Sequence, residues 1–89
     1  MKRSVTVEYS SKFLKSLSRL PAAIITKTQE RERIFRQDAF DPLLATYKLH
    51  GKEKDVWAFS ITHTHRIKFI FLTDTHVLFL EIGTHEIYK

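Results

Sequence analysis

The sequence predicts one α+β domain, in which a strand and two helices precede an antiparallel β-meander and both helices cover one face of a small sheet. Three observations predict this class. The chain has 89 residues, which is enough for one hydrophobic core and too few for two. Apolar residues recur with a helical period after residue 10. Short runs rich in β-branched and aromatic residues fill the C-terminal half, as expected for strands.

The N-terminal half is expected to form a strand and two helices. Residues 4–9 alternate between apolar and polar side chains, which predicts a half-buried strand. Ser10 or Ser11 can cap a helix whose apolar residues fall three or four positions apart, namely Phe13, Leu14, Leu17 and Leu20. Pro21 ends this helix and suits the first turn of a second one, which runs to about Gln37 without glycine or proline.

The C-terminal half is expected to form strands. Asp41-Pro42 marks residues 38–46 as a loop that packs back on the body. The runs that follow predict strands over 47–49, 56–62, 66–72 and 76–82, with turns at 63–65 and 73–75. The last three of these strands would pair in sequence order.

The lengths of the turns predict the register of these strands. A three-residue turn at 63–65 pairs Thr62 with Arg66, Ile61 with Ile67, Phe59 with Phe69 and Trp57 with Phe71. A two-residue turn at Asp74-Thr75 pairs Ile67 with Ile82, Phe69 with Leu80 and Phe71 with Leu78. One face is then apolar and lies under the helices, and the other presents Ser60, Ala58, Arg66, Lys68, Ile70, Gly83, Glu81 and Phe79. A longer final turn would bury an unpaired Glu81, which is unfavourable.

Composition narrows the class of protein. The chain has no cysteine, which excludes a disulfide framework and a thiol nucleophile. It has no apolar run of about 18 residues and no apolar signal core, so we expect a cytoplasmic protein without a membrane span. The net charge is +5, with +6 in residues 1–36 and −1 in residues 37–89. Such a balance favours a nucleic acid or an acidic protein as partner.

The outer sheet face is the first candidate site. Arg66 and Lys68 could hold a phosphate there, and Glu81 could move a proton. The alternative is a solvated ion pair between Lys68 and Glu81.

Histidine is the second feature of interest. His63 and His65 could present two imidazoles to a metal, but they lie in a turn without a third ligand, so we expect no metal site. His85 follows the last strand, near the expected position of Arg66, where it could act as general acid or base. The alternative is a hydrogen-bonded histidine in a turn.

A basic loop around Gly51 is the third feature. Aromatic and cationic residues mix there in a way that suits the stacking of bases and contact with phosphates, and the alternative is a solvated loop. The candidate RNA-binding residues of this segment are Tyr47, Lys48, His50, Lys52 and Lys54, followed by Trp57. The sequence has no phosphate-binding glycine loop and no nucleotide fingerprint, so an enzyme would need no cofactor. Cleavage of RNA by its own 2′-hydroxyl fits this restriction.

Several segments together resemble the RelE/ParE superfamily of toxins from bacterial toxin-antitoxin systems. They are Phe13-Leu14-Lys15-Ser16-Leu17, Tyr47-Lys48-Leu49 with Gly51, Trp57-Ala58-Phe59-Ser60-Ile61, His65-Arg66-Ile67-Lys68-Phe69 and Ile82-Gly83-Thr84-His85-Glu86-Ile87-Tyr88. The resemblance covers nearly the whole chain and implies one toxin domain over residues 1–89. RelE-type members are implied to be metal-independent endoribonucleases that cut mRNA in the ribosomal A site. ParE-type members instead inhibit DNA gyrase.

The resemblance also implies roles for individual residues. Arg66 corresponds to the arginine that contacts the scissile phosphate, His85 to a residue that acts as acid or charge stabiliser, and Tyr88 to an aromatic that orients the base. Lys52 and Lys54 lie where some members keep catalytic or phosphate-binding lysines. The general base stays open among His85, Lys54 and Glu81.

The interpretation that follows is an mRNA-cleaving toxin. Its implied partners are a cognate antitoxin, the ribosome with its mRNA, and operator DNA only through the antitoxin. The basic helices would suit both ribosomal RNA and an acidic antitoxin segment, and charge reversal at Arg31, Arg33 and Arg36 tests that idea. The alternatives are a gyrase inhibitor without enzymatic activity and an inactive binding module.

Overall fold

The computed structural model describes residues 2–51 and 54–84 and confirms the α+β class. The elements in chain order are β1 (Thr6–Tyr9), α1 (Ser11–Ser18), α2 (Ala22–Gln37), the 3-10 helix η1 (Pro42–Leu44), β2 (Tyr47–Lys48), β3 (Trp57–Ser60), β4 (His65–Thr73) and β5 (His76–Thr84). The five strands form one sheet in the order β1-β5-β4-β3-β2. Within the described part of the chain, no helix is both long and apolar enough to cross a membrane.

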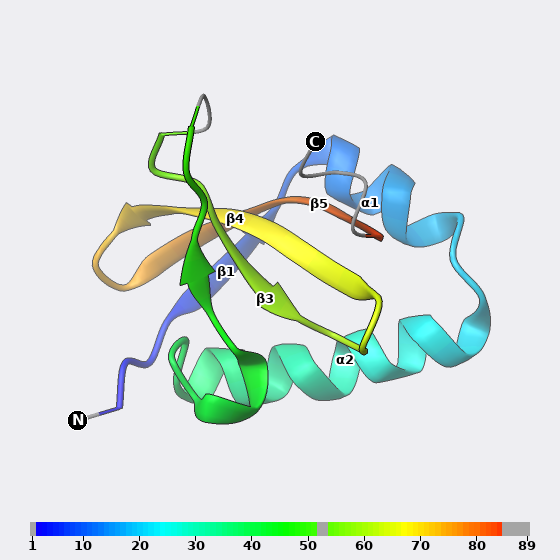
Figure 1. Ribbon diagram of the computed structural model, residues 1–89, viewed down its shortest axis with the longest axis horizontal. Coiled ribbons are helices and arrows are strands. Elements are labelled where there is room, and N and C mark those ends of the chain that lie inside the picture. Colours follow the sequence, from blue (N-terminus) through cyan, green and yellow to red (C-terminus); the bar gives the residue numbers. More distant parts are fainter. Residues whose placement is uncertain (1, 52–53, 85–89) are drawn as a thin grey trace.

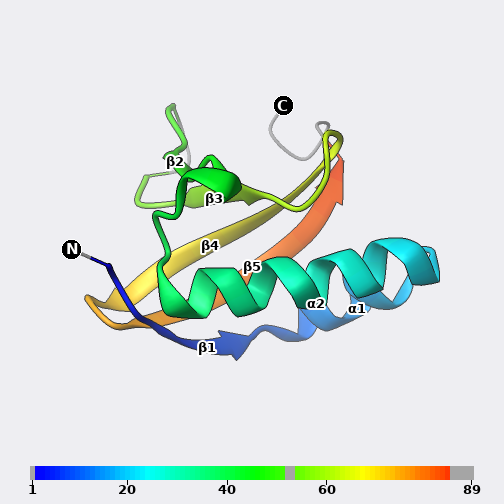
Figure 2. The same cartoon turned by 90° about the horizontal axis from the view of Figure 1, so that it is seen from below.

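Both helices lie on the same face of the twisted sheet (Figures 1 and 2). Phe13 of α1 and Phe35 of α2 each contact the ring of Phe79 in β5, with centroids 5.2 and 5.4 Å apart. Phe35 also stacks on Phe59 and meets Phe69 edge to face. These five phenylalanines are almost completely buried and form the centre of the core. They therefore fix which face of the sheet is left for solvent or a ligand.

Helix α1 covers an edge of β5 that β1 leaves open. Strand β1 runs parallel to β5 and ends opposite Phe79. Beyond that point, the hydroxyl of Ser10 donates to the carbonyl of Leu80 at 3.0 Å, and the hydroxyl of Ser16 accepts the N–H of Ile82 at 3.1 Å. The Ser10 hydroxyl also accepts the N–H of Phe13, which confirms Ser10 as the helix cap. Serines of α1 thus satisfy backbone groups that an edge strand would expose.

The register between β3 and β4 differs by two residues from the prediction. Ser60 pairs with Arg66, Phe59 with Ile67 and Trp57 with Phe69, so β3 ends at Ser60 rather than at residue 62. The turn is longer because the Thr62 hydroxyl accepts the N–H groups of Thr64 and His65, at 3.3 and 3.1 Å. A shift of two residues leaves every side chain on its predicted face.

The predicted register between β4 and β5 is correct at both ends and wrong in the middle. Ile67 pairs with Ile82 as predicted, and Thr73 pairs with His76 across the predicted two-residue turn. Between these two pairs the observed register is shifted by one residue from the predicted one. Phe69 pairs with Phe79 rather than with Leu80, and Phe71 pairs with Val77 rather than with Leu78. Val77 and Phe79 are therefore the buried residues, and the prediction that Phe79 lies on the outer face is wrong.

Two compensating bulges explain this local slip. Leu72 is the extra residue on β4, and Leu80 is the extra residue on β5. The second bulge lies where Ser10 bonds the carbonyls of Phe79 and Leu80. It lets Phe79 and Ile82 both face the helices while Glu81 stays on the outer face.

Candidate functional site

The outer face of the sheet carries two rows of residues that the strand register sets side by side. The first row crosses four strands and contains Tyr47, Ala58, Lys68 and Glu81. The second contains Ser60, Arg66 and Gly83. Directly opposed residues of antiparallel strands have Cβ atoms about 5 Å apart. The fold therefore gathers four of the predicted site residues, Tyr47, Arg66, Lys68 and Glu81, on one face.

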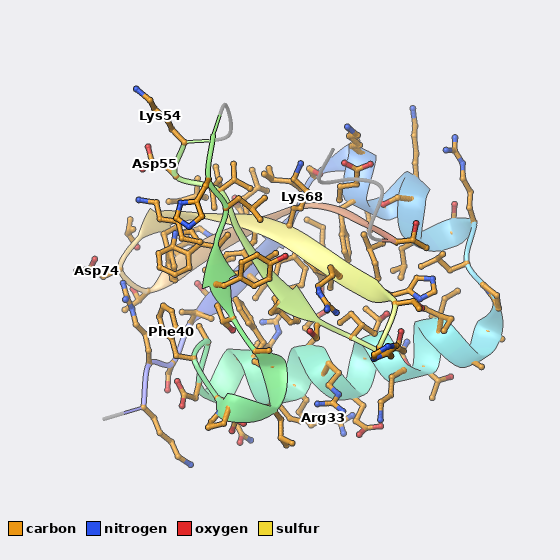
Figure 3. All side chains as sticks on the ribbon, in the orientation of Figure 1. Arg33, Phe40, Lys54, Asp55, Lys68 and Asp74 are labelled. Carbon is orange, nitrogen blue, oxygen red and sulfur yellow. The ribbon has the colours of Figure 1, made fainter. Side chains whose placement is uncertain are left out.

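Lys68 is more buried than the sequence suggested. Its exposed fraction is 7%, and Ala58 beside it is completely buried. Figure 3 shows the Lys68 side chain rising from β4 on the side away from α2. A lysine that is this buried keeps its stem packed on the sheet and presents only its ammonium group. The outer face thus holds the side chain of Lys68 in a packed position, two residues from Arg66 on the same strand.

Glu81 has a partner that the sequence did not reveal. Its carboxylate lies opposite Lys68 in the strand register, and its Oε1 is 3.3 Å from Nζ of Lys12 in α1. The Glu81 side chain is 23% exposed and that of Lys12 is 72% exposed. Because α1 docks against β5, Lys12 reaches the rim of the outer face. A helix thus supplies a partner for Glu81 in addition to its place opposite Lys68.

Arg66 lies where the outer face meets a cleft. Its Nη1 donates to the carbonyls of Thr62 and His65, at 3.2 and 3.5 Å, which holds the guanidinium group against the β3–β4 turn. The cleft has a volume of about 530 Å³ and is open to solvent. It is lined by Lys27, Arg31, Leu43, Ser60, Ile61, Thr62, His63 and Arg66. Figures 1 and 2 show this turn standing over the middle of α2.

The helical side of this cleft was not predicted from the sequence. Lys27 and Arg31 are four residues apart on α2, so they share one helix face. That spacing was readable from the sequence, but its relation to the β3–β4 turn depends on how α2 crosses the sheet. His63 lines the same cleft, whereas the sequence analysis considered it only as a metal ligand and expected no metal site.

The basic arm between β2 and β3 lies apart from Arg66. It holds Lys48, His50 and Lys54 and precedes β3, whereas Arg66 follows the turn at the other end of β3. Lys54 and Asp55 extend from the body in Figure 3. Lys48 Nζ lies 3.9 Å from a carboxylate oxygen of Asp55. The strand order therefore places these candidate RNA-binding residues at the opposite end of β3 from Arg66.

Three candidate residues lie outside the described part of the chain: Lys52, His85 and Tyr88. Among residues 2–51 and 54–84, no cluster of three or more potential ligands could hold a metal ion. His65 Nδ1 lies 3.2 Å from the Thr62 hydroxyl and 3.1 Å from that of Thr64. Hydrogen bonds within the turn thus occupy one of the two histidines considered as metal ligands.

A second charged cluster joins β1 to α2, on the helical side of the molecule. The Tyr9 hydroxyl donates to the Glu32 carboxylate, which also accepts from Nε of Arg36 at 3.0 Å. Burial and the hydrogen bond to Glu32 raise the pKa of Tyr9. Burial alone would lower the pKa of Arg36, but its bonds to Tyr9 and Glu32 raise it. This cluster fixes Arg36 in place and leaves it less free to contact a partner.

Solved toxin structures share this fold. The Escherichia coli DinJ-YafQ toxin-antitoxin complex contains a chain that matches with a TM-score of 0.74 at 17% identity, over 94% of this chain and 96% of that chain. The YoeB/ParE toxin from Agrobacterium tumefaciens matches with 0.73 at 18% identity, over 96% and 99%. A YoeB dimer from Staphylococcus aureus matches with 0.70 at 16% identity, over 91% and 97%. The sequence matches no protein-family model and no curated protein.

Proposed function

Since the chain has the fold of RelE-like toxins, we propose that it is the toxin of a type II toxin-antitoxin system and that it inhibits translation by cutting mRNA on the ribosome. The observation that carries the proposal is the outer face, where Arg66 and the buried Lys68 stand next to each other on β4. Two adjacent cations on a rigid sheet suit a phosphate that gains charge during reaction.

The proposed reaction is attack of an RNA 2′-hydroxyl on the adjacent phosphate. The 2′-oxygen forms a bond to phosphorus, its proton passes to a base, and the 5′-oxygen leaves with a proton from an acid. The products are a 2′,3′-cyclic phosphate and a 5′-hydroxyl end. The substrate supplies the nucleophile, so the protein needs neither a metal nor a cofactor for this step.

Residue roles follow from placement on the face. Arg66 contacts the scissile phosphate, and Lys68 adds positive charge beside it. Tyr47 lies in the same row as Lys68, where its ring can support a base. Lys54 lies in the arm, and Glu81 is held by Lys12, so we assign proton transfer to His85 and base stacking to Tyr88 on the sequence resemblance.

The proposed partners are a cognate antitoxin, the ribosome with its mRNA, and operator DNA through the antitoxin alone. One of the matching structures is a complex of a toxin with its antitoxin, which supports a protein partner of this kind. A toxin that acts on ribosomes would work in the cytoplasm.

Expression of Arg66→Ala tests the proposal in cells. We expect the wild type to arrest growth and to create new mRNA 5′ ends, and we expect Arg66→Ala to lose both effects because the phosphate loses its main cation. Arg19→Ala is the matched control, since Arg19 is exposed at the end of α1 and has no part in the outer face. The readouts are growth after induction and mapping of mRNA 5′ ends.

Two outcomes would contradict the proposal. The first is growth arrest without new mRNA ends but with a DNA-damage response and filamentation, which would indicate inhibition of gyrase. The second is mRNA cleavage by Arg66→Ala at the level of the wild type while Arg19→Ala behaves the same way.

A further inference from the structure

The cleft beside Arg66 is built for an anion. Four of its lining residues have basic side chains, and they come from two walls: Lys27 and Arg31 from α2, and His63 and Arg66 from the β3–β4 hairpin. None of its described lining residues is acidic. The hydroxyl-bearing residues Ser60 and Thr62 add hydrogen-bonding groups on the hairpin wall.

Arg31 is positioned with part of its hydrogen-bonding capacity unused. Its Nη1 donates to the carbonyl of Leu43 at 3.1 Å, which anchors the guanidinium group to η1. Its Nε is buried and is the one buried side-chain polar atom, among the residues that the structure describes, without a hydrogen-bond partner. An unpaired donor on a charged group is unfavourable. The Nε edge of a guanidinium group is also the edge that binds an oxyanion through two parallel bonds.

Lys27 extends the same line of charge along α2. Residues four apart on a helix are separated by about 6 Å along its axis, which is comparable to the separation of neighbouring phosphates on a nucleic acid strand. Lys27 Nζ lies 3.4 Å from Glu30, but both side chains are partly exposed, at 37% and 53%. Exposed pairs of this kind are weak, so a phosphate can replace Glu30 as the partner of Lys27.

We propose that this cleft binds two neighbouring backbone phosphates of single-stranded RNA, next to the phosphate that Arg66 contacts. The inference rests on the proposed function in one respect, namely that Arg66 holds RNA. Phosphate is favoured over carboxylate because Lys27, Arg31 and the hydroxyl-bearing residues Ser60 and Thr62 line the same cleft. Leu43, which is 64% exposed at the rim, offers an apolar contact for a base. The cleft thus adds contacts to the RNA beyond the bond that is cut.

The role predicts a particular kinetic signature. Contacts to a flanking phosphate stabilise the bound substrate and the transition state equally. Loss of Lys27 and Arg31 should therefore raise KM and leave kcat near the wild-type value, whereas loss of Arg66 should lower kcat.

Binding of RNA to the purified protein tests the inference directly. The probe is a fluorescein-labelled RNA of about 10 nucleotides with 2′-O-methyl groups, which cannot be cut. We expect Lys27→Gln with Arg31→Gln to weaken binding about tenfold and to make the dependence of log K on log salt shallower by about 1.4, because two phosphate contacts are lost. The matched control, Lys15→Gln with Arg19→Gln, removes the same charges from exposed positions on and after α1 and should change affinity about twofold or less.

A second variant distinguishes loss of RNA binding from loss of folding. Arg31→Gln also breaks the bond to Leu43, so Lys27→Gln with His63→Gln removes one cleft ammonium group and one imidazole without touching that bond. Thermal unfolding of each variant checks that the fold is retained. Wild-type affinity in both cleft variants, or an equal loss in the control pair, would overturn the inference.

Competition separates RNA from an acidic protein as occupant. Unlabelled RNA should displace the probe at lower concentration than polyglutamate of equal charge, and the reverse order would overturn the assignment to RNA.

The binding assay and the cellular assay can fail independently of each other. Weakened binding in the cleft variants, together with a wild type that cuts no mRNA, would uphold the cleft and refute the endoribonuclease. Cleavage by the wild type with normal binding in the cleft variants would refute the cleft alone.

Discussion

Asp38 shows how single residues join distant parts of this small chain. Its Oδ1 accepts the N–H of Arg3 at 3.1 Å and the N–H of Phe40 at 3.0 Å. These backbone bonds hold the pKa of Asp38 below its usual value of 3.8. The guanidinium group of Arg3 then lies over the ring of Phe71 and donates to the carbonyl of Asp74. Asp38 thus ties the N-terminal segment to the end of α2.

The lowered pKa of Asp38 predicts a pH-dependent contribution to stability. The charged carboxylate stabilises the folded protein above pH 3.8, and the contribution is lost as the pH falls through the lowered pKa. Asp38→Asn keeps an oxygen acceptor and removes the charge. We expect it to be less stable than the wild type at pH 7 and equally stable once the pH is below the lowered pKa. Urea unfolding at both pH values measures the difference, and a deficit that is the same at each pH would contradict the account.

Residue patterns in the sequence identified the strand residues of the site but not the contributions of the two helices. Arg66 and Lys68 were placed on the outer face because alternate residues of a strand share a face, and a two-residue error in the hairpin register left that inference intact. Lys12 was not identified, and Arg31 was named only as one charge of a basic helix, because their roles at the site depend on where α1 and α2 dock. Helical spacing shows which residues share a face and does not show what that face meets.

At the scale of elements, α1 does two things: it packs Phe13 into the core and covers the edge of β5. Ser10 is central to both, because its hydroxyl caps the helix and donates to the carbonyl of Leu80 at the bulge. The bulge in turn determines that Phe79 is buried while Glu81 stays on the outer face. The docking of α1 is therefore part of what arranges the candidate site.

Ser10→Ala tests the importance of this contact. Loss of a helix cap costs about 1 kcal/mol, and a domain of this size loses about 4–8 °C in Tm for each kcal/mol. We expect a decrease in Tm at least that large, because a bond to β5 is lost as well. Ser18→Ala is the control, since the exposed Ser18 hydroxyl bonds only to a carbonyl of its own helix, that of Lys15. Equal Tm values for the two variants would show that the Ser10 contacts add nothing.

The elements themselves were predicted well from the sequence, and the bulges were not. Ser10 and Pro21 mark the starts of the helices in the structure as they do in the sequence. The turn at Asp74-Thr75 is also correct. The identities of Leu72 and Leu80 do not indicate a bulge, because leucine is common in regular strands. Tertiary contacts determine that each is the extra residue of a bulge. The inner and outer faces of β5 were therefore predicted wrongly over Leu78, Phe79 and Leu80.

At the scale of the whole molecule, the position of charge is more informative than its total. The net charge of +5 pointed only to an anionic partner. The structure divides the cations of α2 by role, since Arg36 is engaged by Glu32 and Tyr9, whereas Lys27 and Arg31 face the cleft next to Arg66. At this cleft, cations of the basic helical half lie next to Arg66 of the near-neutral strand half. That place is where we locate the RNA.

The most direct test of the central claim is cleavage of mRNA by the purified protein on programmed ribosomes. The account predicts that the wild type cuts ribosome-bound mRNA and leaves a 2′,3′-cyclic phosphate, without added metal beyond what the ribosome needs. It predicts that Arg66→Ala lowers the rate at least a hundredfold, on the order expected for loss of a group that stabilises transition-state charge, and that Arg19→Ala does not. Cleavage by Arg66→Ala at the wild-type rate, or no cleavage by the wild type, would contradict it.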